Sequence, residues 1–151
     1  MRITEIYIED IDLIEAPKIK GIYMIQTWDR VYIGKSTNIF GRLKYHKTNT
    51  FPKNTKRMYI LEAYKDITDL DLMVMEDFYI CKFKALGYNL ENRVDAMPPK
   101  LRSFLRGGKQ WIKPYKQFKN MESDIFDIEI RETKTKRKRA YLINTSHSKR
   151  F

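Results

Sequence analysis

The chain has 151 residues, a length that suits one domain or a small domain with an appendage. Hydrophobic residues make up 42% of it and aromatic residues 13%, enough for a packed core, which argues against wholesale disorder. A single cysteine excludes an internal disulfide and a cysteine-based zinc cluster. The formal net charge of +11 favours a polyanionic partner, most often nucleic acid, over a merely solubilising surface.

The positive charge is concentrated in the last third of the chain. Residues 1–97 hold 15 Lys+Arg against 14 Asp+Glu, whereas residues 98–151 hold 15 against 5. The boundary falls at Pro98-Pro99, a pair that interrupts helix and sheet alike. We therefore expect a nearly neutral globular domain over 1–97 and a basic extension over 98–151. Because the start shows no apolar leader and no apolar run could span a bilayer, we expect a cytoplasmic protein without a membrane partner.

Strand patterns occur at four places in the first part. The β-branched stretch 3–11 predicts a strand, and 19–25 and 30–34 predict an antiparallel hairpin because the link between them is short. Residues 58–63 predict a further strand. With the two helices described next, this order predicts an α/β fold, a small sandwich with a three-stranded mixed or antiparallel sheet flanked by helices.

Two helices are predicted between and after these strands. Good N-cap residues at 36–38 predict a helix to about Lys47. A second helix is predicted from Asp69 or Asp71 to about Leu86, where Gly87 ends it.

The second helix carries a carboxylate within its apolar stripe. Glu76 lies four residues after Leu72, on the predicted core-facing side, while the neighbouring Asp77 lies off the stripe and is expected in solvent. An unpaired buried carboxylate is costly, so Glu76 is expected to meet a cation, a hydrogen-bond cluster or a metal. A structural salt bridge is the alternative. The stripe at helical spacing consists of Leu72, Met75, Tyr79, Phe83 and Leu86.

Polar residues also interrupt the apolar stripe of the first helix. Arg42 and His46 are four residues apart and so share one helix face. A guanidinium suits phosphate oxygens, and an imidazole can donate to phosphate or relay a proton at neutral pH. The alternative is an ordinary exposed face.

Two tripeptides on the predicted hairpin pair a tyrosine with a glycine, Gly21-Ile22-Tyr23 and Tyr32-Ile33-Gly34. The glycines are expected to leave space for a substrate backbone beside the phenols. A phenol acts as a base near neutral pH only where cations favour its ionised form, and Lys35 and Arg42 are the candidate cations. The alternative is a pair of ordinary strand aromatics.

These tripeptides, with Arg42, His46, Glu76 and Asn89 following in order, resemble the signature of the GIY-YIG nuclease superfamily, and the histidine is typical of its homing and restriction branches. The resemblance covers about residues 19–92. It implies hydrolysis of a DNA phosphodiester with one divalent cation, Mg²⁺ or Mn²⁺.

The resemblance also implies roles for individual residues. Glu76 would hold the metal, and Tyr23 is the first choice for the base that activates water. Tyr32 and His46 would hold the water or phosphate, and Arg42 would offset charge in the transition state. Two supporting roles are implied as well: Lys35 lowering the pKa of a tyrosine, and Asn89 tying the loop after the second helix to the site.

The basic extension is expected to contact double-stranded DNA. Its aromatic residues could stack on bases or pack against the domain. Residues 125–130 and 140–143 predict a strand pair whose tip carries a basic run. The predicted DNA-binding residues are Lys100, Arg102, Arg106, Lys109, Lys113, Lys116, Lys119, Lys136, Arg137, Lys138 and Arg139.

The leading hypothesis is a metal-dependent DNA endonuclease of the homing or restriction kind. Two alternatives stay open: a non-catalytic nucleic-acid-binding protein on the same scaffold, and a structure-selective repair nuclease. Whether the protein forms a homodimer on DNA is also open.

Overall fold

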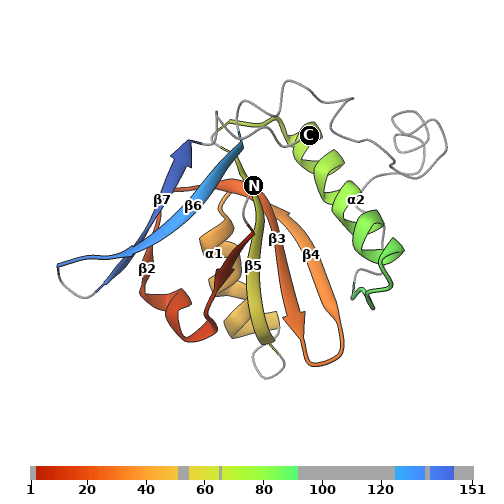
Figure 1. The fold of residues 1–151 in the computed structure, drawn as a ribbon, viewed down its shortest axis with the longest axis horizontal. Helices are drawn as coiled ribbons and strands as arrows, with labels where there is room; N and C mark the ends of the chain where they lie inside the picture. The colour runs from red at the N-terminus through yellow and green to blue at the C-terminus, as the bar shows by residue number, and fades with distance from the viewer. Residues whose placement is uncertain (1–2, 51–54, 65, 92–124, 135–136, 145–151) are drawn as a thin grey trace.

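Three antiparallel strands form the centre of the structure, which is a computed structural model that describes residues 3–50, 55–64, 66–91, 125–134 and 137–144. Strand β3 (Lys20–Thr27) pairs with β4 (Val31–Ser36) on one side and with β5 (Thr55–Tyr64) on the other. These are the three strands that the sequence predicted, so the expected α/β fold with an antiparallel sheet is confirmed (Figure 1).

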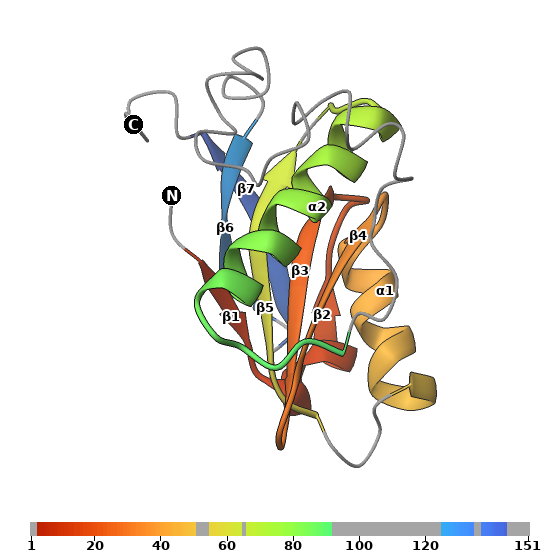
Figure 2. The ribbon, with the colours of Figure 1, turned by 90° about the vertical axis from the view of Figure 1, so that its right-hand side faces the viewer.

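The two faces of this sheet are covered by different helices (Figure 2). Helix α1 (Ile39–Tyr45) continues into a π-helical turn, η2 (His46–Thr50), and packs with Tyr23 and Ile25 in one core cluster. Helix α2 (Asp69–Ala85) covers the other face, where Ile22 and Ile33 meet Met75. Alternation along β3 and β4 thus sends neighbouring residues into separate cores.

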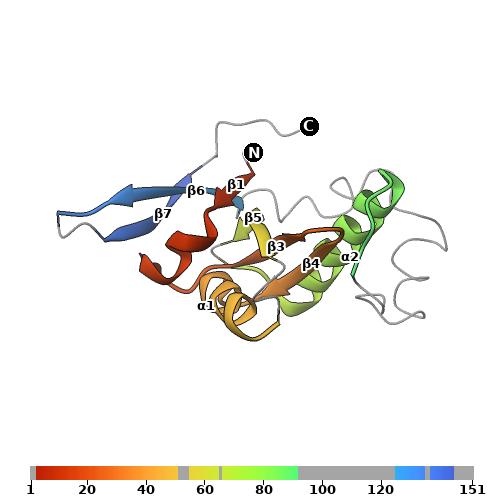
Figure 3. The same cartoon turned by 90° about the horizontal axis from the view of Figure 1, so that it is seen from below.

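Further strands widen the sheet on the side away from β4. The hairpin of β6 (Ile125–Glu132) and β7 (Lys138–Asn144) was predicted and is confirmed, and β6 pairs with β5. The short β2 (Ile14–Glu15) adds to β7, which makes the order β2-β7-β6-β5-β3-β4, while β1 (Thr4–Ile6) pairs with β5 separately. The β6–β7 hairpin therefore belongs to the same sheet, and Figure 3 shows it extending away from α2.

Some local predictions are wrong. The stretch 3–11 is not one strand, because a 3-10 helix, η1 (Ile8–Leu13), follows β1. The cap of α2 is Thr68, whose hydroxyl accepts the Asp71 N–H, and the helix then ends before Gly87 (φ 92°), as expected.

Asp77 is also not in solvent: it is only 1% exposed. The cause is that α2 buries residues on every side of its middle turns, including Val74, Phe78 and Ile80, so it lacks the solvent face that the stripe implied.

Candidate active site

The two tripeptides lie side by side in the sheet, with Tyr23 directly opposite Gly34. A Cβ atom added at Gly34 would lie 2.4 Å from Tyr23 Oη, and one at Gly21 would lie 2.0 Å from the Glu62 carbonyl oxygen. The space beside Gly34 is therefore filled by the Tyr23 ring, and not by a gap for a substrate as the sequence suggested. Both glycines allow close packing that no other residue would permit.

Tyr23 reaches across to the start of the π-helical turn. Its Oη lies 2.8 Å from His46 Nε2, and both side chains are buried, at 1% and 3% exposure. His46 continues the buried face of α1, seven residues after Ile39 and three after Leu43, and its backbone N–H still bonds to the Arg42 carbonyl. Tyr32 completes the cluster, with ring centroids 6.2 Å from Tyr23 and 5.5 Å from His46. Three predicted site residues thus meet on the α1 face.

Arg42 lies at the rim of this cluster and is exposed. Its guanidinium lies over the Tyr45 ring, 5.1 Å from the centroid, and the Tyr45 ring in turn stands edge-on to His46 at 6.0 Å. Sequence reasoning missed Tyr45. The signal was present, because residues three apart on a helix are neighbours and a cation over a tyrosine face is attractive.

The protonation states of the cluster follow from its burial. Burial, and next the neighbouring Tyr32, raise the pKa of Tyr23 above its ordinary value, although the hydrogen bonding and charge of Arg42 lower it. Burial raises the pKa of Tyr32 as well. Burial and then the charge of Arg42 lower the pKa of His46 to about 4. At neutral pH both phenols are protonated and the imidazole is neutral, with a nitrogen able to accept a proton.

Glu76 approaches the same site from α2. Burial raises the pKa of its half-buried carboxyl, while the charge and the backbone N–H of Lys35 lower it. The Glu76 charge also raises the pKa of Tyr32, which places it near the tyrosine cluster. In the described sheet β4 is an edge strand, so its outward N–H groups are available to a side chain from α2. The edge of β4 is thus where residues from the two faces meet.

The two supporting residues also lie at this edge. Lys35 is exposed and acts on Glu76, whereas the cation that acts on both tyrosines is Arg42. Asn89 donates its side-chain N–H to the Asp29 carbonyl (3.3 Å), and its own carbonyl accepts the Val31 N–H (2.9 Å). The loop after α2 is thereby tied to the turn between β3 and β4.

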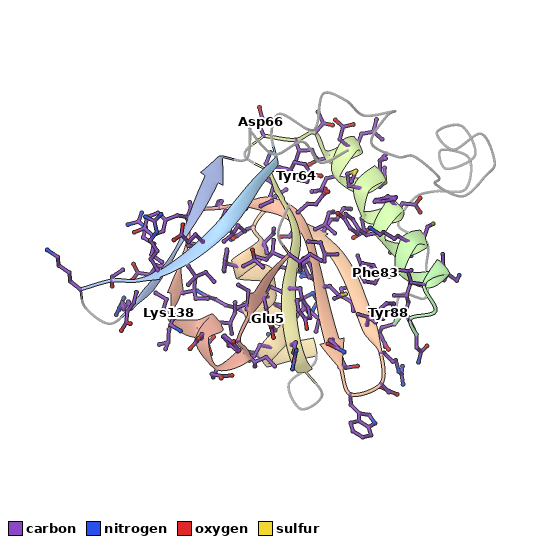
Figure 4. The ribbon with its side chains drawn as sticks, viewed as in Figure 1. Glu5, Tyr64, Asp66, Phe83, Tyr88 and Lys138 are labelled. Atoms are coloured by element: carbon purple, nitrogen blue, oxygen red, sulfur yellow. The ribbon has the colours of Figure 1, made fainter. Side chains whose placement is uncertain are left out.

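A second buried carboxylate was missed by sequence reasoning. Glu62 on β5 is 1% exposed and accepts hydrogen bonds from the hydroxyls of Tyr79 on α2, at 2.8 Å, and of Tyr64. Tyr79 lies one turn beyond Glu76, so this contact fixes α2 against the sheet close to the site. Figure 4 shows Tyr64 where β5 ends, beside the start of α2.

The predicted DNA-binding residues are only partly described. Those from Lys100 to Lys119, and Lys136, lie outside the described residues. Arg137, Lys138 and Arg139 lie at the start of β7, at the edge of the sheet opposite β4.

Among the described residues, no group of three or more His, Cys, Asp or Glu could form a metal cage. No helix in the described part of the chain is both long and apolar enough to cross a membrane.

Comparison with known proteins adds one finding. A family model described as the GIY-YIG catalytic domain matches residues 19–92, the segment that contains Tyr23, Tyr32, Arg42, His46 and Glu76. No curated protein and no solved structure matches the chain.

Proposed function

Since residues 19–92 belong to the GIY-YIG family of nucleases, we propose that this protein is a metal-dependent endonuclease acting on double-stranded DNA, of the homing or restriction kind. The observation that carries the proposal is the meeting of one buried and one partly buried phenol, an imidazole and a guanidinium with one carboxylate at the edge of β4. A cluster of charged and titratable side chains at the edge of a sheet can contact and react with an external substrate.

The proton transfer is assigned to Tyr23 and His46 together. Tyr23 takes a proton from the attacking water as its own phenolic proton passes to His46 Nε2, 2.8 Å away. Because the pKa of Tyr23 is raised, its phenol is protonated at neutral pH, and the base is not a preformed phenolate. The imidazole next to this phenol, with its pKa lowered to about 4, is neutral at neutral pH, so one of its ring nitrogens has a lone pair for the proton while the reaction proceeds.

Arg42 and Tyr32 are assigned to the phosphate. Arg42 is exposed at the rim, so its guanidinium can be reached by a phosphate from solvent. It offsets the negative charge that develops when water attacks phosphorus. The Tyr32 ring lies 6.2 Å from that of Tyr23, and the Glu76 charge raises the Tyr32 pKa, so we assign the Tyr32 hydroxyl to orienting the water or a phosphate oxygen.

GIY-YIG nucleases use divalent metal ions, and Glu76 is the residue that would hold Mg²⁺ or Mn²⁺ here. The residues present fit such an ion, because a single partly buried carboxylate suits a cation that keeps most of its water. When bound, the ion would polarise the scissile phosphate and stabilise the leaving oxygen. The Lys35 N–H holds the carboxylate in place at the strand edge.

Plasmid cleavage tests the proposal. Supercoiled plasmid with Mg²⁺ should be nicked or linearised by the wild-type protein, and EDTA should stop the reaction. Glu76→Ala should show no cleavage, whereas Asp69→Asn, an exposed carboxylate on the first turn of the same helix, should retain it. Cleavage by Glu76→Ala at the wild-type rate would contradict the assignment of the metal.

A further inference from the structure

The exposed face of the β6–β7 hairpin holds two arginines and a tyrosine in contact. Arg131 and Arg139 are directly opposite each other in the strand pairing, and both guanidiniums lie over the Tyr141 ring, at 4.7 Å and 5.8 Å from its centroid. Like charges at directly opposed positions are normally destabilising. Here the ring faces the two cations and holds them side by side.

The packing of the hairpin determines which way this face points. Ile128 and Ala140 alternate with the arginines, and both are buried in the core cluster on the α1 face. Arg131 and Arg139, with Tyr141, therefore lie on the α2 side of the sheet, where both arginines are exposed. This is the side from which Glu76 approaches the edge of β4.

The other described cations of β7 have acidic partners within the chain. Arg137 lies 2.6 Å from Glu15 on β2, and Lys138 lies 2.5 Å from Asp10 on η1. The hydrogen bond to Asp10 raises the pKa of Lys138. These two pairs join the hairpin to the N-terminal segment, more than 120 residues away in the chain. The Lys138–Asp10 pair is the less exposed, with side chains 35% and 21% exposed, against 67% and 55% for Arg137–Glu15. Figure 4 shows Lys138 on the hairpin, far across the sheet from Phe83 and Tyr88.

We infer that Arg131, Arg139 and Tyr141 form a contact surface for the phosphate backbone of the DNA substrate, and that Arg137 and Lys138 are structural. The inference rests on the proposed function for its substrate. Two adjacent planar guanidiniums can each bind a phosphate through paired hydrogen bonds. The acidic neighbour, Glu129, lies 3.0 Å from Arg131 and only two residues away on the same strand, so a phosphate that displaces it separates no distant segments. Displacing Glu15 from Arg137 would instead break a link between β2 and the hairpin.

This surface serves binding and not the chemical step. Between β4 and β7 lie β3, β5 and β6, so the two strands of the hairpin are three and four strand spacings from the catalytic edge, roughly 14–19 Å across a flat sheet. It would therefore contact phosphates some distance from the scissile bond.

A salt titration of DNA binding tests the inference. A labelled 30-base-pair duplex is titrated at several KCl concentrations in EDTA, so that no cleavage interferes. Arg131→Gln/Arg139→Gln is compared with Arg137→Gln/Lys138→Gln, which removes the same amount of charge. The first pair should weaken binding on the order of tenfold and reduce the slope of log K against log[KCl] by about 2, because each lost phosphate contact removes about 0.9. The second pair should keep the slope and lower the melting temperature.

The opposite pattern, with an unchanged slope for the first pair and a flatter one for the second, would overturn the inference. Circular dichroism establishes that each variant is folded before it is titrated. Failure of the nuclease proposal is distinguished from this outcome by the plasmid assay. Absence of cleavage by the wild-type protein contradicts the nuclease, while the slopes report on the surface in either case.

Discussion

Tyr23 Oη and His46 Nε2 lie 2.8 Å apart in the interior of the protein, although 23 residues separate them in the chain. A phenol whose pKa is raised thus shares a hydrogen bond with an imidazole whose pKa is lowered, and a proton can move between them without any change of net charge. Two groups that would each be poor bases alone form one acceptor for a proton from water.

A double-mutant cycle tests whether the pair acts as a unit. Tyr23→Phe and His46→Gln should each lower the single-turnover cleavage rate by about 10²–10⁴-fold, the usual contribution of general acid–base catalysis. The double variant should be little slower than either single variant, because removing one member already disables the pair. Rates that multiply in the double variant would show that the two residues act independently.

The lowered pKa of His46 predicts a specific loss of stability in acid. In the unfolded chain the imidazole binds a proton below its ordinary pKa of 6.5, whereas in the folded protein it does so only near 4. The contribution of this group to stability is therefore fully present above pH 6.5 and is lost as the pH falls from 6.5 toward 4. The loss between pH 7 and pH 5 is on the order of 2 kcal/mol.

Urea unfolding of the wild type and His46→Gln at both pH values measures this difference, and His147→Gln shows what the other histidine contributes. Equal pH dependence in wild type and His46→Gln would contradict the burial of a neutral imidazole.

The raised pKa of Glu76 predicts the opposite dependence of stability on pH. Because burial raises its pKa in the folded state, the folded protein holds this proton more tightly than the unfolded chain does. Below its ordinary pKa the carboxyl therefore does not lower the stability of the folded protein. As the pH rises through the raised pKa of the folded state, the carboxyl ionises and destabilises the fold. Glu76→Gln should thus melt at a higher temperature than the wild type at pH 7 in EDTA, with the gap closing toward pH 4.

Scanning calorimetry over that pH range measures the gap. Added Mg²⁺ should raise the melting temperature of the wild type but not of Glu76→Gln, since only the carboxylate binds the ion. A variant that melts below the wild type at pH 7 would show that the carboxylate stabilises the fold.

The central part of the fold and the clustering of the candidate site residues could be predicted because they depend on local patterns. Tyr23 and Tyr32 lie on two strands joined by a short turn. The pairing of these strands follows from strand alternation and the length of the link. The position of Glu76 follows from helical spacing in the same way.

The unpredicted features depend on contacts that are distant in the chain. The parallel pairing of β2 with β7 joins Ile14 to Lys138, and no local pattern encodes such a register. The burial of Glu62 depends on a tyrosine from α2, and the burial of Asp77 on an α2 that has no exposed middle face. The π-helical turn over His46–Thr50 also has no signal in a periodicity of 3.6 residues.

Gly34 provides a steric test of the site. In Gly34→Ala the new methyl group would meet Tyr23 Oη and Cζ at 2.4 Å, and the buried ring has little room to retreat. We expect destabilisation of about 1–3 kcal/mol from overpacking, and a loss of cleavage activity because the phenol is moved away from His46. Urea unfolding and the plasmid assay measure the two effects.

Gly41→Ala is the matched control, because the nearest atoms to its Cβ belong to the Asn38 side chain, 2.7 Å away at Nδ2, on the exposed side of α1. That side chain can shift, at the cost of weakening the cap it makes to the Gly41 N–H. Alanine is favoured over glycine within a helix by about 0.5–1 kcal/mol, so this variant should stay folded and active. If Gly34→Ala cleaved plasmid as fast as Gly41→Ala, the position of the Tyr23 hydroxyl would not govern the reaction, and the assignment of Tyr23 and His46 as the proton-transfer pair would have to be abandoned.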